Sequence, residues 1–289
     1  MLGSVLGLSG ALVWGSSQVL SKPGLCEMDL ARFALIRAAT GLAFVVPLGL
    51  ATSGFAFSSL SAIGWAVSVR ILDCFLGVLL FMLALQRIQA HEVAPLANSA
   101  PLWGVLASWL FLGEALSLVV LVAALLGVIG AYFLAGHEKG SASVRRRLCG
   151  FAFAIGCGAC WGIAETVPAK YCMSQGMSPA TFQLIVMATT TALWLLAAVL
   201  GRRWRWARSA RRAAVLGTVT GFTGFLLGWT LWLYGLQLAP ASVLAPLRGM
   251  TILFGFIGSV VFLRERPTRR AVLGGALILG GVLLVLALG

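Results

Sequence analysis

Apolar residues run along this chain in long stretches separated by short polar or basic segments. A helix needs about 20 apolar residues to cross the hydrocarbon core of a bilayer. Stretches of about that length cover 3–22, 30–51, 61–85, 91–112, 116–136, 149–172, 178–200, 212–236, 240–263 and 269–288. They do not alternate apolar and polar residues as the strands of a membrane barrel do. Because backbone in hydrocarbon must satisfy its own hydrogen bonds, the pattern predicts ten membrane-spanning helices and an all-α integral membrane protein.

The composition supports the same conclusion. Hydrophobic residues make up 60% of the chain and charged residues only 10%, whereas soluble domains carry about 25% charged residues. So few charges cannot coat a globule of this size, so we expect the lipid bilayer to cover most of its surface. The net charge of +13 does not indicate nucleic acid as a partner, because the basic residues form short runs between apolar stretches and not one basic face.

The basic residues also indicate an orientation. Lys and Arg gather in the loops after the first, third, fifth, seventh and ninth predicted helices, and the loops after the second, fourth and eighth hold none. Loops rich in Lys and Arg usually stay in the cytoplasm. We therefore expect these odd-numbered loops to be cytoplasmic and both termini to lie outside, in a multi-pass protein of a bacterial inner membrane.

A repeat divides the chain. When the sequence is shifted by 151 residues, about 12 of the roughly 30 residues from Leu85 to Glu114 are identical to their partners, including Ala94-Pro95-Leu96 on Ala245-Pro246-Leu247. Trp14-Gly15 likewise resembles Trp161-Gly162 after a small slip. The prediction is two units, 1–136 and 149–289, joined by a basic linker at 137–148.

Each unit holds five predicted helices, and five is an odd number. The second unit therefore enters the membrane from the opposite side, as an inverted repeat. Inverted repeats are typical of secondary transporters, in which the substrate site lies between the halves near the middle of the bilayer.

Two related stretches resemble the fourth-helix signature of the drug/metabolite transporter superfamily, EamA type; they run from Ala84-Leu85-Gln86 through Pro95 and Pro101-Leu102 to Leu112-Gly113-Glu114, and from Leu233-Tyr234-Gly235-Leu236 through Pro246 to Phe262–Arg266. The resemblance covers nearly the whole chain. It implies a ten-helix fold and transport of small organic solutes, often export of amino acids or related metabolites, while some relatives exchange solutes or carry nucleotide sugars or sugar phosphates. The family commonly has a proline after the second Ala-Pro-Leu, where this chain reads Arg248–Ile252.

Polar side chains inside the apolar stretches are candidates for the substrate site, because a central charge costs roughly 2.5–3.5 kcal/mol on insertion scales. Arg248 can anchor a carboxylate or phosphate, or pair with a buried carboxylate. Glu165 can bind an ammonium group or a coupling proton, or link to Lys170. Asn98 can contact a polar solute or hydrogen-bond a neighbouring helix.

Aromatic residues complete the predicted site. Trp14, Trp161 and Trp229, with Gln18, can line a cavity, although tryptophan also collects at membrane interfaces. Trp232 is a further aromatic candidate. Other polar residues have structural interpretations. Arg70 and Asp73 are three apart and should pair, with Arg37 in a similar position. Glu114 and Glu265 end their helices, a position that favours gating or helix-end contacts over substrate binding.

We expect a secondary transporter that moves a small polar metabolite by alternating access. Glu165 and Arg248 together suit a zwitterion such as an amino acid. The alternative is a flippase or carrier for a lipid-linked or phosphorylated substrate. An intramembrane enzyme is disfavoured because the chain lacks the Asp-rich motifs of prenyltransferases and the His-Glu-x-x-His motif of metalloproteases. A primary pump is disfavoured because the chain lacks a Gly-rich phosphate loop, so we expect no catalytic residue, metal or cofactor. We expect the energy to come from a proton or counter-solute gradient or from the solute itself, and the protein to act as a monomer or homodimer.

Overall fold

A computed structural model describes residues 1–52, 54–85, 87, 93, 96–134, 144–200, 210–262 and 268–288. The first half contains α1 (Leu2–Glu27), α2 (Leu30–Ala51), a rod of α3 (Leu60–Arg70), η1 (Ile71–Gly77) and α4 (Val78–Leu85), then α6 (Ala100–Leu112) and α7 (Leu118–Leu134). The second half contains α8 (Val144–Ser174), α9 (Pro179–Leu200), a rod of α10 (Ala210–Thr220), η2 (Gly221–Gly228) and α11 (Trp229–Leu238), then α12 (Ala241–Arg248), α13 (Met250–Phe262) and α14 (Arg269–Leu288).

Within the described residues these elements form ten rods in the predicted order. Seven helices are long and apolar enough to cross a membrane by length and composition, and Ala100–Leu112 and Leu118–Phe133 are shorter apolar helices. Large apolar side chains such as Leu50, Phe111 and Leu200 are exposed on the outside. A surface of this kind belongs in lipid, so the protein is an all-α, multi-pass integral membrane protein.

Local chemistry explains several helix ends. The side chain of Asp29 accepts a hydrogen bond from the Ala31 amide at the start of α2, and Ser59 does the same for Ala62 at the start of α3. Gly113 ends α6 in the left-handed conformation at φ 66°, which glycine adopts without steric cost. The predicted linker at 137–148 differs from the structure, because α8 already begins at Val144.

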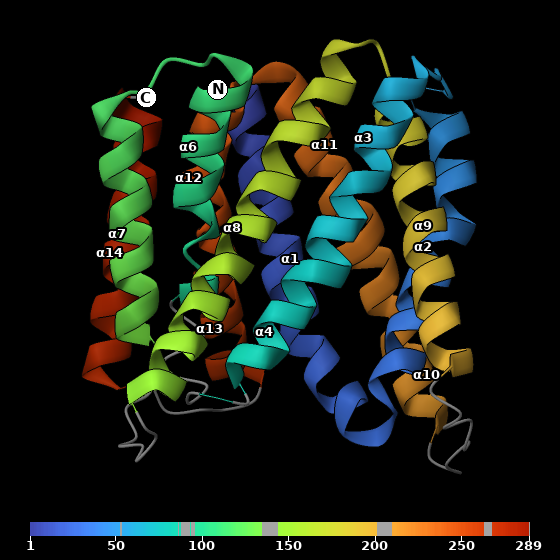
Figure 1. The fold of residues 1–289 in the computed structure, drawn as a ribbon, viewed down its shortest axis with the longest axis horizontal. Coiled ribbons are helices and arrows are strands. Elements are labelled where there is room, and N and C mark those ends of the chain that lie inside the picture. Colours follow the sequence, from blue (N-terminus) through green and yellow to red (C-terminus); the bar gives the residue numbers. More distant parts are fainter. Residues whose placement is uncertain are drawn as a thin grey trace.

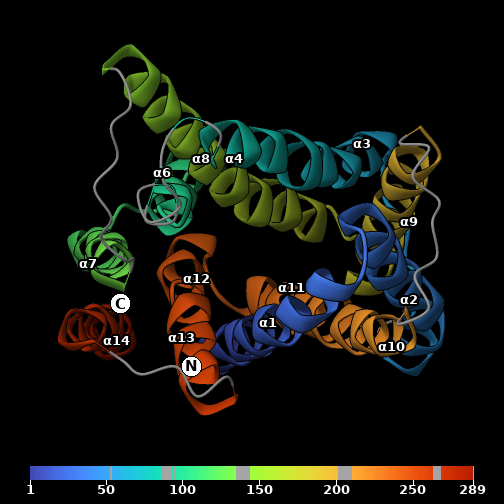
Figure 2. The same cartoon turned by 90° about the horizontal axis from the view of Figure 1, so that it is seen from below.

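The two halves run in opposite directions. Figure 1 shows α1 descending and α8 ascending, and likewise α7 descending and α14 ascending. Equivalent helices pair with each other, α2 with α9 and α7 with α14, at the two ends of the molecule seen in Figure 2. Between these pairs, α1 packs on η2, α11 and α13, while α8 packs on η1, α4 and α6. This exchange of partners is what a twofold axis between two inverted repeats produces.

Both halves interrupt their fourth helix at the same place. In the first half, Asn98 and Ser99 form a turn between the helical residues at 96–97 and α6. In the second half, Gly249 is a turn residue between α12 and α13, 151 positions after Asn98. The first predicted proline of this signature, Pro95, lies outside the described residues, whereas Pro246 lies inside α12. Two interrupted helices therefore flank the central part of the protein.

Candidate functional site

The Trp-Gly repeat brings the two halves into close contact. A Cβ on Gly15 of α1 would lie 2.8 Å from the amide nitrogen of Gly255 in α13, so only glycine fits at this crossing. A Cβ on Gly162 of α8 would meet the amide nitrogen of Gly104 in α6 at the same 2.8 Å. Small residues let membrane helices approach this closely. Both tryptophans that precede these glycines are thereby held at helix crossings.

Each of these tryptophans donates a hydrogen bond to the opposite half. Trp14 Nε1 donates to the carbonyl oxygen of Gly224 at 2.8 Å, and Trp161 Nε1 donates to that of Asp73 at 3.2 Å. The two acceptors are 151 positions apart and lie in the π-helical segments η2 and η1. A π-helical turn disturbs the regular hydrogen-bond ladder of an α-helix, and side chains can then bind the carbonyls.

A glycine makes room for each indole. A Cβ on Gly228 would lie 2.7 Å from Trp14 Nε1, and a Cβ on Gly77 would lie 2.6 Å from Trp161 Nε1. These glycines are also 151 positions apart. We call the two arrangements the Trp14 joint and the Trp161 joint. Each joint consists of a tryptophan, a π-helical carbonyl and a glycine four residues after that carbonyl.

The Trp14 joint continues into an aromatic cluster. The ring of Trp14 lies 5.6 Å from that of Trp229 and 5.5 Å from that of Trp232, between ring centroids. Trp232 is fully buried, and its Nε1 donates to the backbone oxygen of Glu165 at 2.9 Å. These contacts connect α1 through α11 to α8.

Glu165 and Arg248 bind each other. Arg248 Nη2 donates to Glu165 Oε1 at 2.7 Å, and Arg248 Nε donates to Glu165 Oε2. The two side chains are only 8% and 15% exposed, for Glu165 and Arg248 respectively. Of the two interpretations of Arg248 from the sequence, the structure has the pair with a buried carboxylate. A bidentate pair of this kind neutralises both charges inside the bilayer.

Lys170 does not pair with Glu165, which was one interpretation of the sequence. Its Nζ donates to the carbonyl oxygen of Ala239 at 2.8 Å and also to that of Leu236, at the end of α11. The carboxylate of Glu114 accepts hydrogen bonds from the amides of Ala241 and Ser242 at 2.8 and 2.7 Å. Glu114 therefore caps α12, as predicted for a helix-end contact, while Glu265 lies outside the described residues.

The remaining predicted site residues are Gln18, Asn98 and Trp161. Gln18, one turn after Trp14, is exposed, and Asn98 is half-buried at the turn before α6. Trp161 packs against Phe81 at 5.8 Å between ring centroids. The structure thus connects Trp14 and Trp229 through Trp232 to Glu165 and Arg248, while Trp161 forms its own helix crossing and Gln18 is exposed.

Two further arginines lie near the Trp14 joint. Arg70 is 1% exposed, and its Nη1 donates to Asp73 Oδ2 at 2.6 Å, which confirms the pair expected from their spacing. The guanidinium of Arg70 lies 5.0 Å from the ring centroid of Trp229, and that of Arg37 lies 4.4 Å from that of Phe225. Both arginines are recognisable from the sequence as charges within apolar stretches. Their aromatic partners, Phe225 and Trp229, belong to the second half of the chain.

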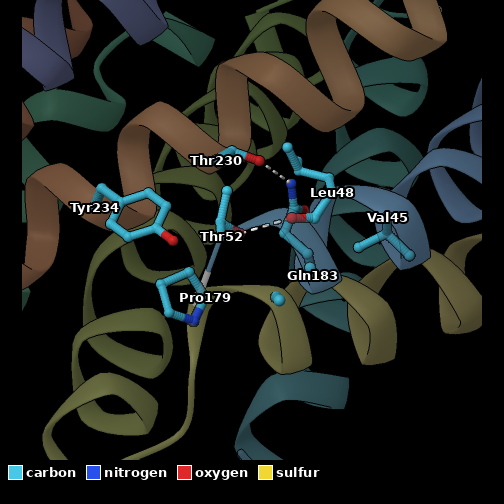
Figure 3. A pocket seen from close by; sticks show the side chains of 9 residues that line it. Val45, Leu48, Thr52, Pro179, Gln183, Thr230 and Tyr234 are labelled. Atoms are coloured by element: carbon cyan, nitrogen blue, oxygen red, sulfur yellow. Dashed lines mark hydrogen bonds between the residues drawn. The ribbon is translucent and has the colours of Figure 1, made fainter. Parts of the chain in front are cut away.

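A small cavity lies between α2, α9 and α11 (Figure 3). Its volume of about 10 Å³ is near the minimum that a single water needs. Gln183 lies on its wall, where its Nε2 donates to the carbonyl oxygen of Leu226 at 2.8 Å and to Thr230 Oγ1 at 3.1 Å. The other end of this amide, Oε1, is buried without a hydrogen-bond partner.

A larger, apolar cavity of about 210 Å³ lies between η1 and α9; its lining includes Cys74, Phe75, Trp194 and Leu196. Phe75 and Leu196 are exposed, so the cavity opens on the outer, apolar surface. Its lining suits a hydrocarbon chain rather than a polar solute.

Comparisons with known proteins agree with this architecture. The sequence model of the EamA-like transporter family matches residues 1–136 and 148–287. No curated protein matches the chain. Among solved structures, one described as "Crystal structure of protein" has a TM-score of 0.80 and 20% identity, over 98% of this chain and 95% of that chain. At this identity the similarity demonstrates a shared fold alone.

Proposed function

Because this chain belongs to the EamA-like transporter family, we propose that it is a secondary transporter that carries a small polar organic metabolite by alternating access. The observation that carries the proposal is the buried charge at the seam between the halves. Glu165, Arg248, Arg70 and Asp73 all lie inside apolar rods, where ionic groups are expensive and usually mark a solute or ion pathway.

The two tryptophan joints are the parts that move. Both cross from one half to the other, and both hydrogen bonds are formed in this structure, at 2.8 and 3.2 Å. Because the halves are inverted, opening one joint exposes the centre to one side of the membrane, and opening the other exposes it to the opposite side. The structure with both joints closed corresponds to an occluded state.

We extend the proposal to the energy source, the direction of transport, the orientation in the membrane and the oligomeric state. We infer that a proton or counter-solute gradient drives the cycle and that the net direction is export. The basic ends of the helices face the cytoplasm of a bacterial inner membrane, and one chain contains a complete pathway, whether it stays a monomer or forms a homodimer. Impermeant thiol labelling of Cys149, which is exposed near the start of α8, tests the orientation in intact cells.

The decisive experiment measures transport by the purified protein. A thermal-shift screen of metabolites identifies ligands, because a ligand that binds only the folded state raises its apparent stability. Counterflow of a stabilising metabolite into liposomes then measures carriage. We expect flux that saturates with wild-type protein and stops in the neutral double variant Glu165→Gln/Arg248→Met, which keeps no unpaired buried charge. Flux in this variant equal to wild type contradicts the assigned pathway.

The apolar cavity favours a second candidate, the flippase for a lipid-linked substrate. Its opening toward lipid between η1 and α9 can admit an acyl chain beside the polar seam. Translocation of a fluorescent phospholipid in the same liposomes distinguishes the two functions. Lipid translocation without flux of any soluble metabolite favours the flippase.

A further inference from the structure

The guanidinium groups of two arginines from different helices lie over the same aromatic ring. The guanidinium carbon of Arg37 in α2 lies 4.4 Å from the ring centroid of Phe225, and that of Arg70 in α3 lies 5.7 Å from it. Phe225 belongs to η2, in the middle of its rod. The two guanidinium carbons therefore lie within about 10 Å of each other at the middle of this apolar rod, where like charges repel with little screening.

Three donor atoms of these arginines are buried without an acceptor. They are Arg37 Nε, Arg70 Nε and Arg70 Nη2. A buried donor that lacks a partner costs about 1–3 kcal/mol, and more when the group is charged. Arg70 as a whole is 1% exposed, so no solvent contact compensates for the missing acceptors.

The carboxylates of the described residues do not neutralise both arginines. Glu165 pairs with Arg248, Glu27 with Arg212, and Glu114 caps α12. Asp29 caps α2. Asp73 remains, and it pairs with Arg70. Among the described residues, Arg37, Arg70 and Asp73 therefore form a group of two positive charges and one negative charge, with an excess of one positive charge.

From this excess we propose that the transported solute is a small organic carboxylate, and that its carboxylate binds between Arg37 and Arg70. The inference rests on the proposed function and specifies its substrate class. Guanidinium groups bind carboxylates through paired hydrogen bonds, which supplies the missing acceptors and cancels the excess charge.

The surroundings define the rest of the ligand. The ring centroid of Trp229 lies 5.0 Å from the guanidinium carbon of Arg70, and the ring of Trp14 meets that of Trp229 edge to face, with 5.6 Å between centroids, so the organic part of the solute meets aromatic side chains. A monocarboxylate matches the single excess charge. Phosphate esters and dicarboxylates carry one more negative charge than the cluster can neutralise.

Matched probes test the charge of the ligand. Benzoate, benzamide and benzylamine share a ring and differ in charge, and acetate, acetamide and ethylamine form an aliphatic set. Each is titrated at micromolar to millimolar concentration against the purified protein, with tryptophan fluorescence and thermal shift as readouts. We expect the carboxylates to bind and the amides and amines not to bind.

Variants assign the binding to the two arginines. Arg37→Gln removes a charge without leaving a carboxylate unpaired, and Arg70→Gln/Asp73→Asn does the same for the second arginine. We expect each to weaken benzoate binding roughly 10- to 100-fold, the range for a lost hydrogen bond to a charged group. Arg37→Lys should retain part of the affinity.

Asp73→Asn has the opposite expected effect. It removes the negative charge that competes with the ligand for Arg70, although the amide oxygen can still accept a hydrogen bond from Nη1, so benzoate binds more tightly than to wild type. A merely structural role for Asp73 does not predict tighter binding.

The outcomes separate this inference from the proposed function. Carboxylate binding that the arginine variants weaken supports the assignment. Equal binding of amides or amines, no binding of any carboxylate, or unchanged binding in the arginine variants overturns it. If liposome counterflow carries only amines or other solutes without a carboxylate, the transporter stands and the carboxylate assignment fails; if nothing is carried while carboxylates bind, the site stands and the transporter fails.

Discussion

The Trp14 joint and the Trp161 joint have the same geometry and different surroundings. In both, an indole donates to a π-helical carbonyl of the other half, at 2.8 Å to Gly224 and 3.2 Å to Asp73. Around Trp14 lie two further tryptophans, and two arginines lie close by. Around Trp161 lie Phe81 and the apolar cluster that includes Cys157, and the side chain of its acceptor residue, Asp73, pairs with Arg70.

Aligning the two repeats shows at which positions their residues differ. Glu165 stands four residues after Trp161, and Gln18 stands four residues after Trp14. Arg248 corresponds to Ala97, which is fully buried. The repeat therefore preserved the contacts that hold the halves together, while the charged residues differ between them.

The largest expected effect comes from breaking the ion pair that only one half contains. Arg248→Met leaves the Glu165 carboxylate buried alone, which destabilises proteins by about 3–5 kcal/mol. Thermal unfolding in detergent measures this loss. The double variant Glu165→Gln/Arg248→Met should recover most of it, and Gln18→Ala at the corresponding exposed position should change stability by less than about 0.5 kcal/mol. An equal loss for Gln18→Ala contradicts the asymmetry.

Filling the glycine of either joint should have the next largest effect. Gly228→Ala and Gly77→Ala place a Cβ 2.7 and 2.6 Å from an indole nitrogen, so the indole must move and its hydrogen bond is lost. Overpacking of this kind costs about 1–3 kcal/mol. Gly64→Ala and Gly127→Ala are matched controls, because their Cβ atoms meet nothing within 4 Å. If the controls lose as much stability, the joints are not the cause.

Removing the indole nitrogens should distinguish the two joints. Trp14→Phe loses the shorter hydrogen bond and disturbs two ring contacts, whereas Trp161→Phe loses the longer bond and disturbs one. Each aromatic pair contributes about 0.5–1.5 kcal/mol, so Trp14→Phe should cost about 1 kcal/mol more. Chemical denaturation measures the stability of the two variants, and transport assays run in parallel measure their activity. Equal losses show that the aromatic cluster adds nothing to the Trp14 joint.

The smallest effect should come from removing the exposed ion pair between the end of α1 and the start of α10. Arg212 Nη1 lies 3.3 Å from Glu27 Oε1, and their side chains are 71% and 25% exposed. Exposed pairs contribute about 0–1 kcal/mol, so Arg212→Ala should barely shift the unfolding temperature and should leave transport intact. A large loss of transport would place the coupling between α1 and α10 at this end and not at the Trp14 joint.

Several features followed from sequence periodicity. The ten apolar stretches predicted the ten rods within a few residues, and the 269–288 segment coincides with α14. The pairing of Arg70 with Asp73 followed from a spacing of three residues on one helix. The shift of 151 positions predicted the two related halves, and the odd number of helices in each predicted their inversion. The related interruptions at Asn98 and Gly249 share the register of the repeat.

The sequence by itself determined what depends on neighbours along one helix: the spans, the repeat, the Trp-Gly positions and the local ion pair. Only the tertiary structure decided what those positions contact. Glu165 and Arg248 are 83 residues apart, and Trp14 and Gly224 are 210 apart. Helical periodicity reports which residues share a face, but the partner of that face depends on how whole helices cross. For the same reason the π-helical segments, and the placement of Arg37 and Arg70 on Phe225, could not be read from the sequence.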